Sequence, residues 1–210
     1  MVNIVDSFCW EPHRKILTPE QSGIPVLRCF GLHTSKSAGL PLYDHIHKGC
    51  MELVFLLKGF QIYEASGCLY NLSGYDIFVA YPDEVHSSAT YPQNVSSLIW
   101  MQLELSGEGP LLGLDGETSR LLRRELLSLP RLFSGDSALE GTLTDAFFLL
   151  RQGGELERCM GQQTLVYSLL RMISLSRKLS VRKSDCVEKV IPYLYEHLSE
   201  EISLEEAAAF

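Results

Sequence analysis

The residue types that could do chemistry gather in one stretch of the chain. His45 and His47 stand two apart, Glu52 follows after four intervening residues, and His86 comes later, shortly after Pro82. Residues two apart on a strand project to the same face, so His45 and His47 should point together into the mouth of a barrel. The four intervening residues make a turn, which lets Glu52 face the same space from the adjacent strand. Three imidazoles and a carboxylate around one cavity would suit a divalent first-row metal ion with open positions.

The same four side chains allow two other interpretations. They could bind an organic effector directly, or they could simply line a closed barrel, because single histidines on strands are more often hydrogen-bonded core or surface residues than ligands. The metal interpretation is therefore conditional and no cofactor is certain. Zinc, nickel, iron and manganese are the divalent ions that suit this donor set.

The elements that must position these residues are strands. Residues 26–105 are rich in β-branched and aromatic residues, and turn signals such as Lys58-Gly59 and Ser73-Gly74 separate short runs. We expect strands over Val26–His33, Leu53–Leu57, Gln61–Glu64, Cys68–Leu72, Tyr75–Tyr81, Val85–Thr90 and Leu98–Leu105. This series, with no helical segment between its members, predicts a small antiparallel sandwich or barrel. The last strand alternates, with Leu98, Trp100, Gln102 and Glu104 on one face and Ile99, Met101, Leu103 and Leu105 on the other.

Beyond residue 110 the hydrophobic period becomes helical. Helices are expected over residues 115–127, 136–152, 155–179 and 185–199. The third is apolar on more than one face, since Leu165, Val166, Leu169, Leu170, Met172, Ile173 and Leu175 fall within eleven residues. The barrel can cover one face only, so we expect a homodimer that pairs through residues 155–179. The alternative is a helix sandwiched within its own subunit.

Composition narrows the class of protein. The 210 residues carry 18 Lys and Arg against 26 Asp and Glu, a formal charge of −8, so the chain by itself should not grip DNA. No apolar run approaches the roughly 20 residues that cross a bilayer, and no secretory signal begins the chain, so no membrane partner is expected. The six cysteines are scattered without a C-x-x-C pair. This usage indicates reduced thiols in a cytoplasmic protein.

The histidine stretch resembles the first conserved motif of the cupin family, G-x5-H-x-H-x(3,4)-E-x6-G. Gly39, His45, His47, Glu52 and Gly59 match it at every defined position. The second cupin motif is met in part only: Gly74, Pro82 and His86 are recognisable, but the spacing from the proline to the histidine is one residue shorter and the final asparagine is missing. The resemblance implies an antiparallel, jelly-roll-like barrel, and it aligns His86 less securely than the other three site residues.

The end of the chain is similar to the start of the DNA-binding domain of AraC-type transcription regulators. A capping box, Ser203 with Glu206, predicts a new helix beginning at Leu204. The positions that match the regulator pattern are Ile191, Tyr193, Leu194, His197, Ile202, Ser203, Leu204, Glu205 and Ala207. The resemblance implies a cupin barrel that senses a small molecule, helices that mediate dimerisation, and DNA contact only through recognition helices that this sequence lacks. We therefore expect the chain to be a fragment of a longer protein.

Together these observations predict an α+β protein in three parts: an effector-binding cupin barrel at 1–110, a helical dimerisation region at 111–182, and the start of a helix-turn-helix domain at 183–210. The expected function is effector sensing in an AraC-type regulator, and not catalysis. The alternative is a metal-dependent cupin enzyme, a dioxygenase or a sugar isomerase. Because sugars are common ligands of the regulator family, Tyr43 and Trp100 join His45, His47, Glu52 and His86 as ligand-binding candidates, and no residue is assigned a catalytic role.

Overall fold

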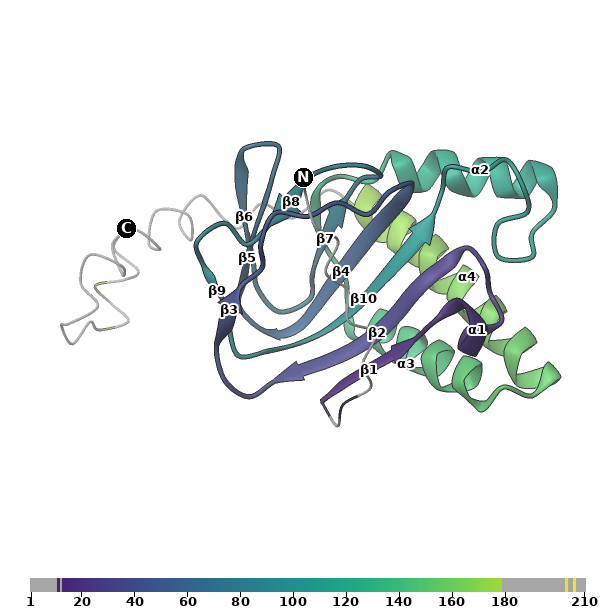
Figure 1. Ribbon diagram of the computed structural model, residues 1–210, viewed down its shortest axis with the longest axis horizontal. Coiled ribbons are helices and arrows are strands. Elements are labelled where there is room, and N and C mark those ends of the chain that lie inside the picture. Colours follow the sequence, from purple (N-terminus) through teal and green to yellow (C-terminus); the bar gives the residue numbers. More distant parts are fainter. Residues whose placement is uncertain (1–10, 12, 179–202, 204–205, 207–210) are drawn as a thin grey trace. The chain divides into compact units, whose positions relative to one another are not determined.

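The computed structural model describes residues 11, 13–178, 203 and 206 (Figure 1). The chain divides into two compact units, Met1–Ser176 and Arg177–Phe210. The first unit carries the barrel and its helices and is described below. In the second unit the predicted capping box is confirmed. The Ser203 backbone N–H and hydroxyl both donate to the Glu206 carboxylate, at 2.8 Å each, and the Glu206 N–H donates back to the Ser203 hydroxyl at 3.2 Å. The helix expected at 185–199 lies outside the described residues.

The largest element of the first unit is a six-stranded sheet with the order β1-β2-β10-β4-β7-β11. Every pairing in it is antiparallel. Its strands are β1 (Arg14–Leu17), β2 (Leu27–Ser35), β4 (Cys50–Gly59), β7 (Asp76–Ala80), β10 (Ser96–Glu104) and β11 (Leu132–Ser134). The long central strands β4 and β10 lie side by side along the whole length of their pairing (Figure 1).

Two smaller sheets lie on the other side of the barrel. One has the order β6-β5-β8 and the other pairs β3 with β9. The strands are β3 (Gly39–Pro41), β5 (Gln61–Ala65), β6 (Cys68–Leu72), β8 (His86–Ser87) and β9 (Pro92–Gln93). The chain passes from the six-stranded to the three-stranded sheet between the end of β4 and the start of β5. Strands β5 and β6 form a hairpin whose turn, at Ser66-Gly67, uses two left-handed residues, as tight hairpins require.

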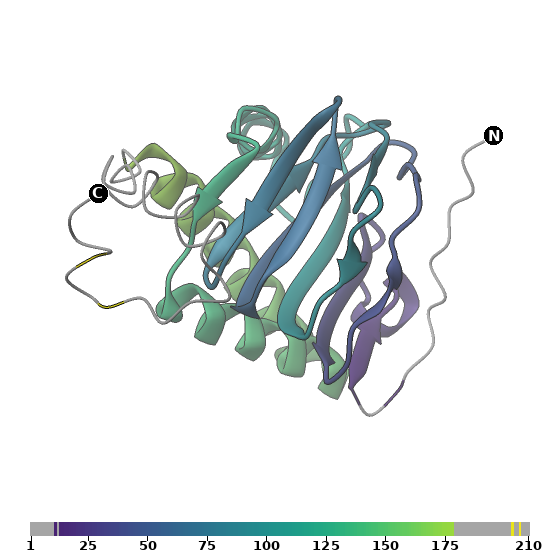
Figure 2. The same ribbon diagram turned by 90° about the vertical axis from the view of Figure 1, so that its left-hand side faces the viewer.

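Helices cover the opposite face of the large sheet (Figure 2). They are α1 (Pro19–Ser22), α2 (Gly116–Leu127), α3 (Ser137–Gln152) and α4 (Glu155–Arg177). Aspartates begin α2 and α3: Asp115 accepts from the Thr118 N–H at 2.8 Å, and Asp136 from the Leu139 N–H at 2.9 Å. Gly153, with φ of 78°, ends α3 in the left-handed conformation.

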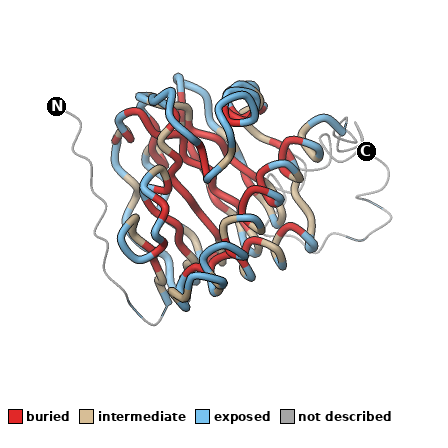
Figure 3. The backbone as a smooth tube through the Cα atoms, turned by 90° about the vertical axis from the view of Figure 1, so that its right-hand side faces the viewer, coloured by how far each residue is buried: buried red, intermediate tan, exposed pale blue. Residues whose placement is uncertain are grey.

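The strand period divides the buried residues into two cores, one on each face of the large sheet. On β4, Met51, Leu53 and Phe55 pack toward the helices. Val54 and Leu56 alternate with them and pack inside the barrel. Figure 3 shows the resulting pattern, with buried backbone concentrated in the central strands and on the inner sides of the helices. The face assignment predicted for residues 98–105 is confirmed, because Trp100 lies in the inner core and Ile99, Met101, Leu103 and Leu105 lie in the outer one.

Helix α4 has one apolar face packed within its own subunit and a second one that is exposed and could pair with another chain. Leu165, Val166, Leu169, Met172 and Ile173 are buried within the subunit. A second stripe, at spacings of three, four and seven residues, is exposed to solvent: Leu156, Met160, Tyr167 and Leu170. We call these four residues the α4 stripe. Pairing of two chains through this helix stays a prediction.

The predicted α+β fold, an antiparallel cupin-type barrel followed by helices, is confirmed by this topology. Barrel and helices share the outer core, and one compact unit contains both the part predicted as 1–110 and residues 111–176 of the part predicted as 111–182. The four cysteines among the described residues, Cys29, Cys50, Cys68 and Cys159, are free thiols, as predicted. Among the described helices, none combines the length and the apolarity that crossing a membrane requires.

Candidate metal centre

Glu52 is placed by the central pair of strands. It lies on β4 between Ala80 of β7 and Gln102 of β10, which are its direct cross-strand partners. Because it alternates with Met51 and Leu53, its carboxylate turns away from the helices and into the barrel. The side chain is nearly inaccessible, with 7% of the residue exposed. A carboxylate this deep is stable only when charged or hydrogen-bonded partners surround it.

Two of the three histidines come from irregular backbone. His45 and His47 lie between β3 and β4, outside any regular strand, which corrects the strand expected for them. His45 instead forms an isolated antiparallel bridge with His86 at the start of β8, with N–H···O distances of 3.1 and 3.0 Å in the two directions. This bridge, and not a shared strand face, brings the first two imidazoles beside the third.

Two hydrogen bonds of Asp83, which we call the Asp83 staple, hold the loop of His47 against the loop that leads to His86. The Gly49 N–H donates to the Asp83 carboxylate at 3.0 Å, and the Asp83 N–H donates to the His47 carbonyl at 3.4 Å. Both Gly49 and Asp83 adopt positive φ, 68° and 62°. Aspartate tolerates this conformation better than most residues, so Asp83 can make the turn that glycine would otherwise make. The staple fixes the loop of His47 against the loop that leads to His86.

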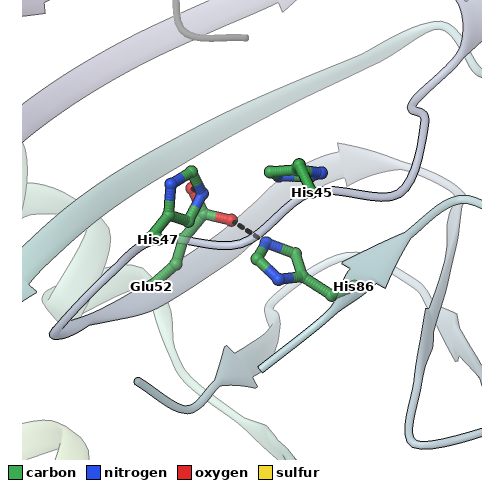
Figure 4. A group of neighbouring side chains, drawn as sticks. All are labelled: His45, His47, Glu52 and His86. Atoms are coloured by element: carbon green, nitrogen blue, oxygen red, sulfur yellow. Dashed lines mark hydrogen bonds and ion pairs between the residues drawn. The ribbon is translucent and has the colours of Figure 1, made fainter. Parts of the chain in front are cut away.

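The four side chains converge on one point (Figure 4). One donor atom from each of His45, His47, Glu52 and His86 lies within 4.8 Å of the other three, and all four residues are buried. His86 Nε2 lies 3.1 Å from Glu52 Oε2, and His47 Nε2 lies 3.3 Å from Glu52 Oε1. The sequence-based prediction that these residues face one another is thereby met.

The far sides of two imidazoles are tied to backbone carbonyls. His45 Nδ1 lies 2.8 Å from the Tyr43 carbonyl, and His86 Nδ1 lies 3.1 Å from the Glu84 carbonyl. A carbonyl only accepts, so each Nδ1 carries the proton and donates. Each Nε2 is then the nitrogen available to a ligand, which is the arrangement typical of metal-bound histidine.

The electrostatics of the cluster favour a carboxylate facing imidazolium. Burial by itself raises the pKa of Glu52, but hydrogen bonds from His47 and His86 outweigh it and hold that pKa well below its usual range. Burial lowers the pKa of His86, but the hydrogen bond and charge of Glu52 outweigh it and raise that pKa. Burial, followed by repulsion from His86, lowers the pKa of His45. The cluster therefore contains both a ready anionic ligand and a neutral imidazole.

Gln102 belongs to this site although no site role was predicted for it. Its Nε2 lies 3.0 Å from Glu52 Oε1, to which it donates, and 3.1 Å from His47 Nε2, and the residue is 2% exposed. The sequence did contain a signal, since the alternation of residues 98–105 put Gln102 on the same face as Trp100. A glutamine on a buried strand face needs polar partners, and the histidine cluster supplies them.

The two aromatic candidates have different outcomes. Trp100 lines a small pocket of about 100 Å3 that reaches Glu52 and His45, and its role in ligand binding stays a prediction. Tyr43 is 71% exposed and is not among the residues that line this pocket. Its position is therefore corrected: the extended segment turns its ring outward, and it serves the site through its carbonyl. Other residues also line the pocket: Arg14, His33, Leu42, Val54, Tyr63, Gln93 and Leu98.

The donor set fits a divalent transition metal. Three imidazoles and one carboxylate, buried and fixed by partners outside the cluster, are typical ligands of zinc, iron, nickel and manganese sites. The predicted ligand set His45, His47, Glu52 and His86 is thus brought together in full. The structure supports a possible metal site and leaves the identity of the ion open.

Comparison with solved structures finds proteins of the cupin class. A predicted oxalate decarboxylase from Thermotoga maritima is 17% identical, with a TM-score of 0.37 over 43% of this chain and 80% of that chain. KdgF from Halomonas sp. is 20% identical, with a TM-score of 0.35 over 45% of this chain and 81% of the other. A cupin protein from Bacteroides fragilis is 19% identical, with a TM-score of 0.38 over 55% and 97%. No family model matches the chain. A search of curated proteins finds no match.

The prediction that the chain is not an enzyme is corrected. The Thermotoga protein carries the name of a decarboxylase. The prediction rested on the resemblance of residues 191–207 to a regulator. Those residues lie outside the barrel, and a buried set of three histidines and one glutamate can equally hold a catalytic metal ion.

Proposed function

We propose that the barrel is a divalent-metal site at which a small molecule is bound and transformed, as in a metal-dependent cupin dioxygenase or sugar isomerase. One observation carries the proposal: four buried donors, from three separate segments of the chain, lie within 4.8 Å of one another. Removing an ionised group from water costs roughly several kcal/mol even when it is paired, so a fold that buries this many ionisable groups normally uses them.

The residues in and around the cluster would either bind the metal ion or orient the residues that bind it. His45, His47, Glu52 and His86 would be the ligands. The carbonyls of Tyr43 and Glu84 fix the orientation of two imidazoles, and Gln102 fixes the Glu52 carboxylate. A bound divalent ion supplies Lewis-acid or redox chemistry at its open positions.

The pocket beside the cluster limits what can be transformed there. At about 100 Å3 it admits a small molecule or one end of a larger one. Val54, Leu98 and Trp100 form the apolar part of its wall. Burial, followed by the charge of Glu52, raises the pKa of Tyr63, so its phenol stays neutral and acts as a hydrogen-bonding group.

The proposal is tested by metal analysis of the purified chain. After incubation with zinc, iron, nickel or manganese and removal of free ion, we expect about one equivalent of metal per chain. The double variant His45→Ala, Glu52→Gln should retain much less than the wild type while keeping the same far-ultraviolet circular dichroism. Equal retention by a folded double variant would refute the site. Oxygen consumption and sugar isomerisation by the loaded protein then separate the two kinds of enzyme.

A second candidate function is effector sensing in an AraC-type regulator. The capping box at Ser203 and Glu206 favours it, because these two residues stand where the regulator pattern has the entry to a helix-turn-helix. In this function the barrel binds the effector, and DNA contact needs recognition helices beyond the present sequence. A longer chain that carries them should bind duplex DNA, and the effector should change that affinity.

The free thiols suit the cytoplasm, which we propose as the compartment for either function.

A further inference from the structure

A second pocket lies at one end of the large sheet, where β1, β2, β4 and β10 meet helix α3. Its volume is about 290 Å3. We call it the β1–α3 pocket. It contains none of the four candidate metal ligands, and nothing in the proposed function uses it.

The titratable side chains that line the β1–α3 pocket are all basic. Lys15, Lys36, His13 and His33 line it, and no acidic residue is among the described residues that do so. This is unusual in a chain whose formal charge is −8. Ammonium groups gathered in a concave site focus a positive potential there, which attracts anions.

Hydroxyl groups complete the polar side of the pocket. Thr34, Ser97 and Thr144 contribute them from β2, β10 and α3. The Thr34 and Ser97 hydroxyls lie 3.2 Å apart and hydrogen-bond to each other. One of these two hydroxyls therefore keeps a proton to donate outward, and hydroxyl donors beside ammonium groups suit carboxylate oxygens.

The position of Lys15 is fixed by an aromatic contact. Its Nζ lies 5.4 Å from the centre of the Phe148 ring on α3. Thr144 precedes Phe148 by four residues and so shares its face of the helix. The ammonium group is thus held near the Thr144 side of the pocket, which lowers the entropic cost of using it in binding.

The floor of the pocket is apolar. Leu32, Leu57 and Ile99 form it, on the outer face of the large sheet. A bare inorganic anion would leave this floor exposed to water, whereas an anion with a hydrocarbon part would cover it. Burying apolar surface adds about 25 cal/mol per Å2 to binding, so the apolar part contributes affinity as well as selectivity.

From this arrangement we infer that the β1–α3 pocket binds a small organic carboxylate, with its charge at Lys15 and Lys36 and its hydrocarbon part on the leucine floor. His33 and Leu98 line both this pocket and the pocket beside the metal cluster, so they form a shared wall. The His33 ring stands edge-on to Trp100, with 6.5 Å between ring centres.

The test uses hexanoate as probe, with hexanol and acetate as the uncharged and the short comparison compounds. Titrations are made on the full chain in the Trp10→Phe background, in the presence of a chelator, and followed by Trp100 fluorescence. Saturation-transfer NMR detects binding that leaves the fluorescence unchanged. Hexanoate should bind saturably and more tightly than either comparison compound.

Variants locate the binding. Lys36→Gln and Lys15→Gln should each weaken hexanoate about tenfold, because each removes a charged hydrogen-bond donor. The matched control Arg120→Gln removes one positive charge from α2, away from the pocket lining, and should change affinity by less than about twofold at physiological salt. His45→Ala should leave hexanoate binding unchanged, since the inference does not depend on the metal site.

Four results would overturn the inference. These are the absence of saturable hexanoate binding, hexanol binding as tight as that of hexanoate, equal weakening by Arg120→Gln and Lys36→Gln, or loss of binding in His45→Ala. Lys36 is exposed, so its variant is expected to fold and keeps the test decisive if Lys15→Gln does not.

Discussion

Replacing Gln102 by leucine removes the amide that orients the Glu52 carboxylate and leaves the proposed metal ligands in place. Gln102 donates to Glu52 Oε1 at 3.0 Å and lies 3.1 Å from His47 Nε2, in a site where it is itself 2% exposed. Leucine has a similar volume and no polar atoms, so the fold should be kept and the orientation of the carboxylate lost. All four proposed ligands remain in the variant.

The expected loss is large enough to measure. Removing a group that orients a metal ligand typically lowers metal affinity 10- to 100-fold, which is about 1.4 to 2.7 kcal/mol. The metal-free protein should also lose about 1 to 3 kcal/mol of stability, because the buried Glu52 carboxylate loses a hydrogen-bond donor. Competition with a chromogenic chelator measures the first quantity, using zinc as probe, and urea denaturation measures the second.

Gln61→Leu is the matched control. Gln61 is also a buried glutamine, and its Nε2 donates to the Asn94 carbonyl at 3.0 Å and to the Ser96 hydroxyl at 2.8 Å. Both of these partners lie outside the cluster. The control should therefore lose stability and keep zinc affinity. Wild-type zinc affinity in folded Gln102→Leu, or the same loss of affinity in both variants, would refute the orienting role of Gln102.

The remaining predictions concern association, packing and pH. Leu170→Glu, in the exposed α4 stripe, should turn a dimer into a folded monomer in light scattering; a monomeric wild type at micromolar concentration would contradict the proposed pairing. Gly31→Ala should cost about 1 to 3 kcal/mol and shift Trp100 fluorescence, because a Cβ there would lie 2.2 Å from the Trp100 ring; an unchanged melting temperature would count against this tight packing. The Thr118 N–H and hydroxyl hold the pKa of Asp115 below its usual value, so its charge stabilises helix α2 above the unfolded pKa of about 3.9, and this contribution is lost as pH falls through the folded pKa. The melting-temperature difference between wild type and Asp115→Asn should therefore shrink on acidification, and a constant difference would show that the charge is not involved.

The sequence predicts the strands and helices best where a long periodic pattern is present. The alternation from Leu98 to Leu105 gives the correct faces of β10, and the helical period gives α2 and α3 nearly to the residue. Strands β1, β3, β9 and β11 were not predicted. Each has only two to four residues and exists because a longer neighbour offers it a hydrogen-bonding edge, which local pattern does not encode.

The four cluster residues were predicted for an incomplete reason. Their spacing suggested a shared strand face, but His45 and His47 are positioned by the bridge to His86 and by the Asp83 staple. These are contacts between segments more than thirty residues apart, so no local period reveals them. The outward turn of the Tyr43 ring has the same origin, since its backbone leaves the regular strand before the site.

The interface variant also depends on knowing the structure. From the sequence, Leu169 is as good a choice as Leu170, because the apolar run is continuous. In the structure Leu169 is fully buried and Leu170 is 52% exposed. A charge at Leu169 would disturb the core, and only a charge at Leu170 tests association.

The metal cluster joins two sheets that are otherwise held by separate interactions. Glu52 belongs to the six-stranded sheet, whereas His86 begins β8 of the three-stranded one. The smaller sheet rests on the inner core, and the larger sheet is supported by both cores. In amide hydrogen exchange, β5 and β6 should therefore open as a local unit while β4 and β10 stay closed. A metal ion bound to both Glu52 and His86 would link the two sheets. Metal binding should therefore slow amide exchange in β5 and β6, although no side chain of these two strands belongs to the site.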